Sequence, residues 1–303
     1  MQTDEVTQSQ SKKSESFCPS FSLVLPAYNE EKSILSTVNN IRQYLDMANC
    51  EYEIIVVNDG STDDTGDILR SQLDIKLIEH PRNRGYGAAL KTGIRHAKYS
   101  LIVITDADGT YPNQRIPELV SLSWQADMVV GARIGANVKY STLRKIPKWF
   151  LARFAEWITM SSIPDLNSGL RVFKKSILEE FLNILPNSFS FTTTITMAML
   201  TNNYIVHYEP IDYHDRVGKS KIKPIRDTLR FVQLILRTGV YFAPLRIFLP
   251  VAGLFFAAFL FTLAQDIFVR KDLTERTLLL LFSSTQLGMF ALLADMVDKR
   301  NRK

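Results

Sequence analysis

Three short polar segments in the first 110 residues each follow directly on a run of apolar residues. They are Pro-Ala-Tyr-Asn-Glu at 26–30, Asn-Asp-Gly-Ser at 58–61 and Asp-Ala-Asp at 106–108. In open parallel α/β sheets, ligands bind outside the carboxyl ends of the strands, so these segments are expected to converge on one crevice. Each alone is compatible with an ordinary turn, because Asp59 and Ser61 are typical turn residues and Asp63 or Asp64 is a suitable helix cap.

The pair formed by Asp106 and Asp108 carries the most chemical information. Two carboxylates so close together repel each other unless a cation or hydrogen-bond donors compensate their charge. Mg²⁺ and Mn²⁺ prefer a few carboxylate oxygens together with phosphate oxygens. The position of this pair after the apolar run at 101–105 therefore predicts a divalent metal site that also holds a diphosphate.

The elements that position these segments are predicted from the apolar pattern. Five short stretches rich in Val, Ile and Leu predict strands at 21–25, 52–57, 75–78, 101–104 and 128–130. Ile34, Val38, Ile41 and Leu45 have helical spacing between the first two. This alternation predicts an α/β fold with a mostly parallel sheet covered on both faces. Residues 133–213 are less regular, and we expect them to complete the domain with helices near 149–160 and 193–201.

Beyond Pro224 the composition changes, and residues 225–242 have an amphipathic helical pattern. The polar positions on one face are Arg226, Arg230, Gln233 and Arg237. The apolar positions on another face are Leu229, Val232, Leu236 and Val240. Arginines on the wet side of such a helix favour a membrane surface. The alternative is a helix that packs on the preceding domain.

Two apolar stretches follow, at 247–264 and 277–294, and each is about 27 Å long as a helix, close to the thickness of the bilayer hydrocarbon. The linker at 269–276 is short, so the pair is predicted to form a transmembrane hairpin. The competing interpretation is a soluble helical hairpin buried in a dimer. Basic residues flank both outer ends but also occupy the linker, so charge bias alone does not decide the orientation.

These features divide the chain into four parts. They are a polar, disordered tail at 1–20, an α/β domain at 21–223, an amphipathic interfacial helix at 224–243, and a hairpin with a basic tail at 244–303. The tail lacks the apolar core of a secretion signal. We therefore expect an integral protein of the plasma membrane, or of an ER-type membrane, with the catalytic domain and both termini in the cytoplasm.

Charge and cysteine content narrow the class of partners. The formal net charge of +5 suits an anionic substrate or an anionic leaflet, and falls short of a nucleic-acid-binding signature. Cys18 and Cys50 are too few for a disulfide framework, and we expect both to be reduced thiols. The composition leaves the oligomeric state, including a homo-oligomer, open.

Several longer motifs resemble the family 2 glycosyltransferases of the GT-A fold. They are LPAYNEE, VVNDGSTDDT, RNRGYGAALKTGI and TDADGTYP, in this order. The downstream VGAR, PDLNSGLRVFKK and HDRVGKSKI, with the terminal hairpin, resemble one branch of that family. This branch contains dolichol-phosphate mannose synthase and the bacterial polyprenyl-phosphate glycosyltransferases. The resemblance covers about 21–221.

The resemblance implies a set of site residues. Its nucleoside-binding positions match Pro26, Tyr28, Glu30, Val57 and Asp59. Its diphosphate and metal positions match Asp106, Ala107 and Asp108, with Asp106 and Asp108 as ligands of Mg²⁺ or Mn²⁺. Its basic positions near the phosphates match Arg133 and, on a closing loop, Arg216 and Lys221. Asp165 and Ser168 match the stretch that faces the reacting centre.

Two departures from the family pattern are visible. Thr110 stands where the mannose synthases commonly have a Gln, which puts the third protein ligand of the metal in doubt. The Gln-x-x-Arg-Trp signature of polymerising synthases is missing, which argues against a polymerising enzyme. A dinucleotide-dependent oxidoreductase is also disfavoured, because the Gly-rich segment at 85–90 lacks the last glycine of GxGxxG and follows Arg-Asn-Arg instead of a strand.

The expected reaction is an inverting, metal-dependent transfer of a hexose from a GDP- or UDP-linked donor to dolichyl or undecaprenyl phosphate at the cytoplasmic face. The expected catalytic residues are Asp108, Arg133 and Asp165. Asp165 is expected either to act as a base or to orient the sugar, with a turn-capping role as the alternative. The competing functions are transfer to another membrane-associated acceptor and an inactive membrane scaffold.

Overall fold

The computed structural model describes residues 18–134, 152–213 and 224–300. Within these residues, a seven-stranded sheet has the order β3-β2-β1-β4-β6-β5-β7. The strands are β1 (Phe21–Ala27), β2 (Tyr52–Asn58), β3 (Lys76–Glu79), β4 (Leu101–Ile104), β5 (Met128–Ala132), β6 (Arg171–Lys174) and β7 (Val206–Pro210). β6 runs antiparallel to β4 and β5, whereas the other strand pairs are parallel. The predicted α/β fold with a mostly parallel sheet is confirmed.

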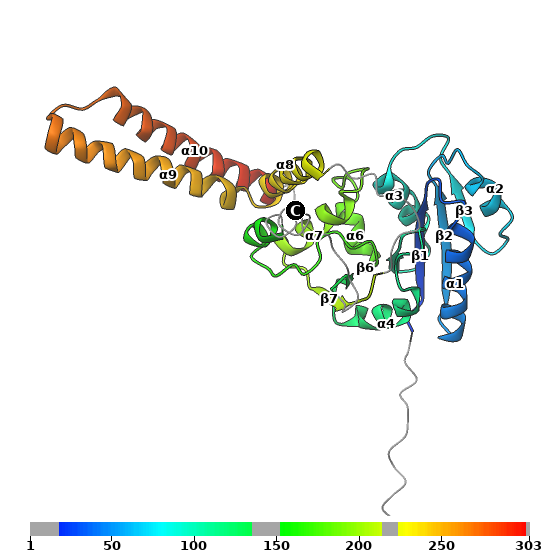
Figure 1. The fold of residues 1–303 in the computed structure, drawn as a ribbon. Helices are drawn as coiled ribbons and strands as arrows, with labels where there is room; N and C mark the ends of the chain where they lie inside the picture. Colours follow the sequence, from blue (N-terminus) through cyan, green and yellow to red (C-terminus); the bar gives the residue numbers. More distant parts are fainter. Residues whose placement is uncertain (1–17, 135–151, 214–223, 301–303) are drawn as a thin grey trace, which may run out of the picture.

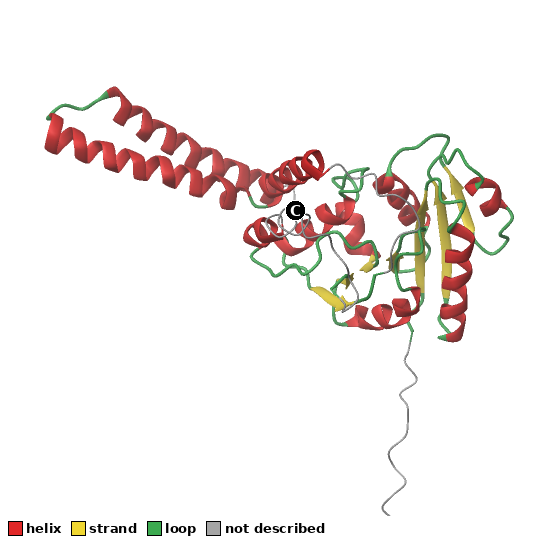
Figure 2. Cartoon of the chain, in the orientation of Figure 1, coloured by secondary structure: helices red, strands yellow, loops and turns green. Residues whose placement is uncertain are grey.

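Helices cover both faces of the sheet (Figures 1 and 2). They are α1 (Ile34–Met47), α2 (Thr65–Arg70), α3 (Tyr86–His96), α4 (Ile116–Ser121), α6 (Lys175–Phe181) and α7 (Phe191–Thr201), with short 3-10 turns η1 (Asn113–Arg115) and η2 (Leu122–Trp124). Every residue of β1 is buried because its side chains point alternately to two cores. Leu23 lies in the core with α1 and Val24 in the core with α3. Two-sided burial explains why apolar residues occupy both faces of the strand, in which Ser22 is the one polar side chain.

The expectation that Cys18 and Cys50 are free thiols is wrong, because the structure joins them in a disulfide. Cys18 lies three residues before β1 and Cys50 two residues before β2, and these strands are neighbours in parallel register, with Phe21 opposite Tyr52. Their Cα atoms are therefore 5.3 Å apart, within the range that a disulfide bridges. Spacing along the chain does not reveal such a register, so the pairing was missed.

We expect reduction of this disulfide to lower the thermal unfolding midpoint of the full-length protein. The bond closes a loop over a sequence separation of 32 residues. A loop of this size stabilises the folded state by about 2–4 kcal/mol, mainly by restricting the unfolded chain. That corresponds to a fall of about 5–15 °C for a domain of this size. The midpoint is measured with and without dithiothreitol, and the Cys18→Ser variant serves as a control that dithiothreitol leaves unchanged. Equal midpoints for oxidised and reduced wild-type protein would contradict the prediction.

Helix α8 (Pro224–Phe242) joins the sheet domain to the C-terminal helices. Its described side chains begin at Val232 and present two different faces. Ile235 and Phe242 are buried against the domain, as in the packing alternative. Leu236 and Val240, which belong to the predicted apolar face, are exposed instead. The helix therefore packs on the domain by one face, and its proposed contact with a membrane rests on the other.

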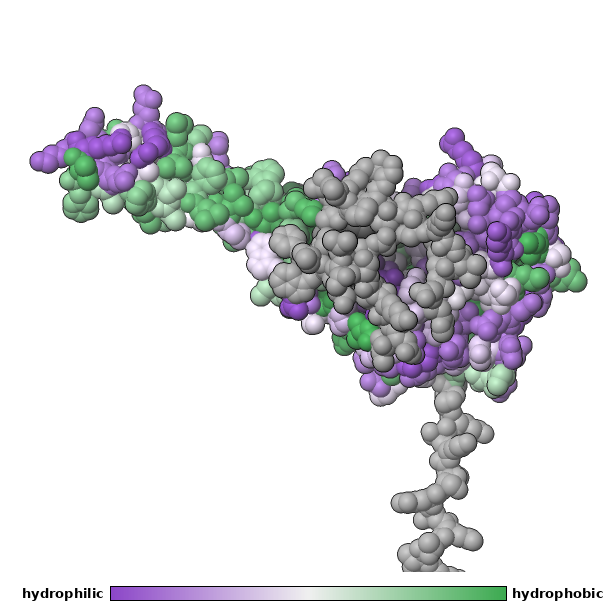
Figure 3. Space-filling view, in the orientation of Figure 1, coloured by the Kyte–Doolittle hydropathy of each residue, from purple (hydrophilic) through white to green (hydrophobic). Residues whose placement is uncertain are grey.

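The last two helices form the predicted hairpin. They are α9 (Pro244–Gln265), continued by a π-helical turn η3 (Asp266–Arg270), and α10 (Glu275–Arg300). Pro244–Arg270 and Glu275–Val297 are long and apolar enough to cross a membrane, with mean hydropathies of 2.4 and 1.7. The hairpin projects from the domain as an apolar rod with a polar tip (Figure 3). At the tip, Asp266 accepts hydrogen bonds from Thr274 and Thr277, which fasten the two helices together.

Candidate functional site

The three predicted polar segments lie at neighbouring strand ends. β2, β1 and β4 are adjacent and parallel, with Ala27 opposite Asn58 and Val24 opposite Ile104. Residues 28–30, 59–63 and 105–108 therefore leave the sheet from the same edge. Convergence follows from strand order and register, which bring together residues up to 80 positions apart in the chain.

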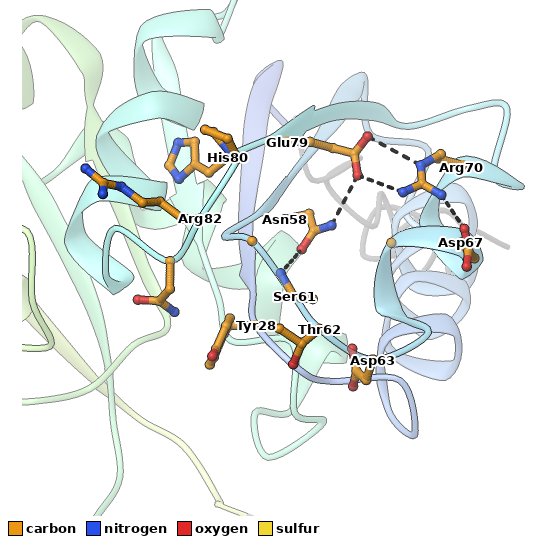
Figure 4. A pocket seen from close by; sticks show the side chains of 14 residues that line it. Tyr28, Asn58, Ser61, Thr62, Asp63, Asp67, Arg70, Glu79, His80 and Arg82 are labelled. Atoms are coloured by element: carbon orange, nitrogen blue, oxygen red, sulfur yellow. Dashed lines mark hydrogen bonds and ion pairs between the residues drawn. The ribbon is translucent and has the colours of Figure 1, made fainter.

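A cavity of about 420 Å³ lies at the β2 side of this edge (Figure 4). Its lining comes from the loops after β1, β2 and β3 and from α2: Tyr28, Asn58, Gly60, Ser61, Thr62, Asp63, Gly66, Asp67, Arg70, Glu79, His80, Pro81, Arg82 and Asn83. This volume falls within the range of small-molecule sites. Among the residues predicted to hold a nucleoside, Tyr28 lines the cavity and is half exposed. Pro26 and Val57 are buried within β1 and β2 and do not line the cavity.

One wall of the cavity is a hydrogen-bonded polar chain that sequence reasoning missed. Asn58 accepts a hydrogen bond from the backbone N–H of Ser61 and donates one to Glu79 at 3.2 Å. Glu79 also pairs with Arg70, as Figure 4 shows. A Cβ added at Gly66 would lie 3.1 Å from Asn58 Nδ2, so a larger residue there would press on these hydrogen-bonded side chains. The only available signal was the position of Asn58 at a strand end.

Asp59 is buried and bonded to the protein's own loop. Its Oδ1 lies 2.6 Å from His80 Nδ1 and accepts the N–H of Arg84 at 3.0 Å, and its Oδ2 accepts the N–H of Gly85 at 2.8 Å. His80 Nε2 lies 2.9 Å from the hydroxyl of Thr92 on α3. Through these bonds Asp59 fixes the loop after β3, which lines part of the cavity and leads into α3.

Glu30 is likewise tied to neighbouring side chains. Its carboxylate accepts a hydrogen bond from the hydroxyl of Ser33 at 3.0 Å, and its backbone N–H donates to Thr65 at 2.9 Å. The bond to Thr65 joins the loop after β1 to the start of α2. The predicted nucleoside contact of Glu30 stays a prediction.

Asp106 lies at the end of β4 among hydroxyl groups. The hydroxyl of Tyr86 donates to Asp106 Oδ1 at 2.9 Å. Burial, and then the nearby Asp106 charge, raise the pKa of Tyr86 well above its usual value, so this phenol stays protonated and remains a donor. The neighbouring Ala107 is buried, and its carbonyl accepts a hydrogen bond from Thr37 on α1 at 3.2 Å. The carboxylate of Asp106 is thus held in a defined orientation.

Asp108 follows in a tight turn in which Gly109 has φ +71°, a conformation that glycine adopts readily. Its Oδ1 accepts both the N–H of Thr110 at 3.2 Å and the Thr110 hydroxyl at 2.6 Å. Thr110, which departs from the family pattern, therefore orients the carboxylate of Asp108. Among the described residues, the two hydrogen bonds to Asp108 explain why a threonine is suitable at position 110.

The donor set at this edge fits a hard divalent cation that shares its coordination with phosphate. In the described part of the chain, no group of three or more His, Cys, Asp or Glu side chains is placed to hold a metal. Two carboxylates with the remaining positions left to phosphate and water is the arrangement that Mg²⁺ uses at nucleotide sites. Asp106 and Asp108 would hold such an ion.

Arg133 and Asp165 form a two-pronged ion pair beside this edge. Arg133 Nε lies 2.7 Å from Asp165 Oδ2 and Nη2 lies 2.9 Å from Oδ1, and the backbone N–H of Arg133 also donates to Oδ2. The Asp165 side chain is fully buried, whereas 15% of the Arg133 side chain is exposed. The guanidinium also lies over the ring of Tyr213 at 5.2 Å. Asp165 therefore orients Arg133.

The segment after Asp165 is held by a buried cation that sequence reasoning missed. The guanidinium of Arg171 donates to the carbonyls of Leu166 and Ser168 and to the hydroxyl of Thr196. It is fully buried, and this desolvation lowers its pKa. Ser168 is buried too, and its hydroxyl donates to the carbonyl of Gly131. Both residues shape the backbone opposite Asp106. Arg216 and Lys221 lie outside the described residues.

We expect Gly169→Ala to impair catalysis without unfolding the protein. A Cβ at Gly169 would lie 2.8 Å from Asp106 Oδ2 and 3.0 Å from its Cγ. The obstacle is the end of one side chain, so the fold survives when that carboxylate moves away. A displacement of this size costs about 10²-fold in rate at a reacting centre. The kcat is compared with the thermal unfolding midpoint, and a variant with wild-type kcat would contradict the prediction.

Two family models match the chain. The model of glycosyl transferase family 2 matches residues 22–182, and the model of the GtrB C-terminal hairpin matches residues 243–299. An undecaprenyl-phosphate 4-deoxy-4-formamido-L-arabinose transferase of Pseudomonas savastanoi is 29% identical over 80% of this chain and 73% of that protein. The low-salt glycan biosynthesis hexosyltransferase Agl6 of Haloferax volcanii is 26% identical over 72% of this chain and 53% of that protein.

Solved structures share the fold of the sheet domain. Glucosyl-3-phosphoglycerate synthase of Mycobacterium tuberculosis, solved with Mn²⁺, UDP and phosphoglyceric acid, has a TM-score of 0.53 at 19% identity, covering 73% of this chain and 77% of that one. Mannosyl-3-phosphoglycerate synthase of Rubrobacter xylanophilus has a TM-score of 0.57 at 16% identity, covering 72% of each chain.

Proposed function

The chain belongs to glycosyl transferase family 2, and on that premise we propose that it transfers a hexose or related sugar from a nucleotide-sugar to a polyprenyl phosphate at a membrane surface. The observation that carries the proposal is the carboxylate pair Asp106 and Asp108, which leaves the sheet from the same edge as a cavity of about 420 Å³, in a chain with two C-terminal helices that are apolar enough to cross a membrane. The proposed donor is GDP- or UDP-linked, and the proposed acceptor is dolichyl or undecaprenyl phosphate. The relatives that act on undecaprenyl phosphate support the acceptor class.

The proposed reaction is one in-line displacement. An oxygen of the lipid phosphate forms a bond to the anomeric carbon while the bond from that carbon to the diphosphate breaks, so the configuration inverts. The nucleophile already carries negative charge, so no strong base is needed. Asp106 and Asp108 would hold a divalent cation, which would supply a Lewis acid for the departing diphosphate. Mn²⁺ complexes among the solved family structures support this part of the proposal.

The protein's own residues account for the remaining tasks. Tyr86 and Thr110 fix the two carboxylates, which keeps them in place as charge develops. Arg133, whose guanidinium is held by Asp165, supplies a positive charge for the phosphates. The cavity lined by Tyr28, Ser61 and Arg82 is the proposed nucleoside subsite. Arg216 and Lys221 are proposed to add positive charge over the diphosphate.

The proposed location follows from the acceptor, which stays in the bilayer. Both ends of a hairpin that crosses the membrane lie on one side, so α8 and the C-terminus share the face of the catalytic domain. We propose that this face is the cytoplasmic one, and the Cys18–Cys50 disulfide would then lie in a compartment where thiols are usually kept reduced. The proposal would also place the exposed side chains Leu236 and Val240 of α8 at the lipid headgroups.

The test is a transfer assay with full-length protein in membranes, with Mg²⁺ or Mn²⁺. The donors are UDP-glucose, UDP-N-acetylglucosamine, GDP-mannose and UDP-4-deoxy-4-formamido-L-arabinose, and the acceptors are undecaprenyl and dolichyl phosphate. Sugar transfer to extractable lipid phosphate is expected with one donor. Transfer to a different membrane-associated acceptor would refute the proposed acceptor. No transfer with any pair would refute the proposal in favour of an inactive membrane scaffold.

A further inference from the structure

The connection from α6 to α7 links the base of the hairpin to the catalytic carboxylates. At its start, the ring of Phe181 packs edge-on against Phe242, the last residue of α8, with centroids 6.3 Å apart. Near its end, the ring of Phe189 stacks on Tyr86 at 5.2 Å, with 16° between the planes. Tyr86 in turn donates to Asp106. In Figure 1 this connection lies between α8 and α3.

The connection is held firmly against α3. The ammonium group of Lys91 donates to the carbonyl of Leu185 and to Asn187 Oδ1, and the carbonyl of Asn187 accepts the N–H of Ala88 at 3.2 Å. A Cβ at Gly87 would lie 2.2 Å from the carbonyl oxygen of Pro186, so the two backbones touch. The position of Phe189 is therefore set by these contacts.

Phe189 is nevertheless 79% exposed. One face of its ring rests on Tyr86, and the rest of this large apolar group faces outward beside the catalytic edge. Exposed apolar area of this kind is stabilised when a hydrocarbon covers it. The ring offers no polar atom to the hydroxyl groups of a sugar, which are recognised by hydrogen bonds.

From these observations we propose that Phe189 is a binding residue for the first isoprene units of the lipid acceptor, an inference that rests on the proposed function. To bring its phosphate to a diphosphate at Asp106, the acceptor must lift its first units out of the bilayer. The connection from Phe181 to Phe189 follows that route from the base of the hairpin. Phe189 covers hydrocarbon that would otherwise meet water, and it orients the phosphate toward the anomeric carbon.

The test compares two acceptors that share a phosphate monoester but differ in hydrocarbon, farnesyl phosphate and butyl phosphate. Full-length protein is assayed at saturating concentration of the donor that the wild-type protein uses. Phe189→Ala is expected to raise the KM for farnesyl phosphate about tenfold, or about 1.4 kcal/mol, and to leave the KM for butyl phosphate and for the donor unchanged. Phe189→Leu, which keeps an apolar side chain, is expected to restore most of the affinity.

The matched control is Trp124→Ala. Trp124 is 77% exposed but ends η2, four residues before the start of β5, and so lies at the sheet edge opposite Asp106. Trp124→Ala is expected to leave the KM for farnesyl phosphate and the KM for butyl phosphate unchanged. An equal loss for both acceptors would overturn the inference in favour of a phosphate contact, and a raised donor KM would overturn it in favour of sugar stacking. Unchanged kinetics in Phe189→Ala would overturn it outright.

A second measurement separates this inference from the proposed function. Farnesyl phosphate carrying a diazirine on its first isoprene unit is irradiated with the full-length protein, and the labelled peptide is identified. Labelling of residues 182–190 is expected, and labelling confined to other segments overturns the inference whether or not sugar is transferred. Failure of wild-type protein to glycosylate any prenyl phosphate, by contrast, refutes the proposed function.

Discussion

Replacement of Asp108 by asparagine is expected to lower kcat for sugar transfer about 10³-fold while the protein stays folded. Asparagine keeps the size of the side chain and an oxygen that accepts from Thr110, but it removes the negative charge. Loss of one charged ligand would weaken the binding of the proposed divalent cation, which would stabilise the departing diphosphate. A 10³-fold loss in rate corresponds to about 4 kcal/mol. The measurement is kcat at several Mn²⁺ concentrations, with the apparent Mn²⁺ affinity expected to fall as well.

Asp74→Asn is the control for this experiment. Asp74 also carries a carboxylate and pairs with Arg42 at 2.8 Å, but its side chain is 66% exposed. Exposed pairs of this kind contribute at most about 1 kcal/mol to stability, so both kcat and folding should stay near wild type. The assignment of the metal site fails if Asp108→Asn keeps wild-type kcat and the same response to Mn²⁺.

Strands β1 to β5 and the order of the polar segments that follow β1, β2 and β4 were predictable from sequence because they depend on local patterns. β4 and residues 54–57 of β2 are continuous apolar runs, and β1 is interrupted only by Ser22. Parallel strands with both faces buried have this pattern in any sequence. β6 was not predicted, because its four residues begin with Arg171 and end with Lys174. Its strand conformation depends on pairing with β4 and β5, which is a tertiary effect.

The partners of the site residues were not predictable, since they depend on register. His80 stands 21 residues from Asp59, and nothing in that spacing indicates a contact. The same holds for the disulfide of Cys18 with Cys50 and for the burial of Arg171 beneath the 165–168 segment. For α8, a helical period identifies apolar positions but does not say which of two apolar surfaces the domain covers. Leu236 and Val240 belong to the predicted apolar face and are exposed, whereas the domain covers Ile235 and Phe242.

Asp165→Asn is expected to reduce both stability and catalysis, because Asp165 acts through Arg133. The Asp165 carboxylate is fully buried and accepts two bonds from the guanidinium and one from the Arg133 backbone. Removing one partner of a buried ion pair costs about 3–5 kcal/mol, since it leaves the other charge uncompensated. The thermal unfolding midpoint of the full-length variant and its kcat/KM are measured together, and both are expected to fall.

A double-mutant cycle with Arg133→Met distinguishes this role from general-base catalysis. If Asp165 only positions Arg133, the rate loss in the double variant Arg133→Met/Asp165→Asn should equal the loss in Arg133→Met alone, because the guanidinium to be positioned is already gone. If Asp165 instead takes a proton from the acceptor, its removal should slow the Arg133→Met enzyme further, by the 10²–10⁴-fold typical of a general base. A lipid phosphate that is already ionised needs no proton removed. The two short bonds between Asp165 and Arg133 are the geometry expected when the carboxylate positions the guanidinium.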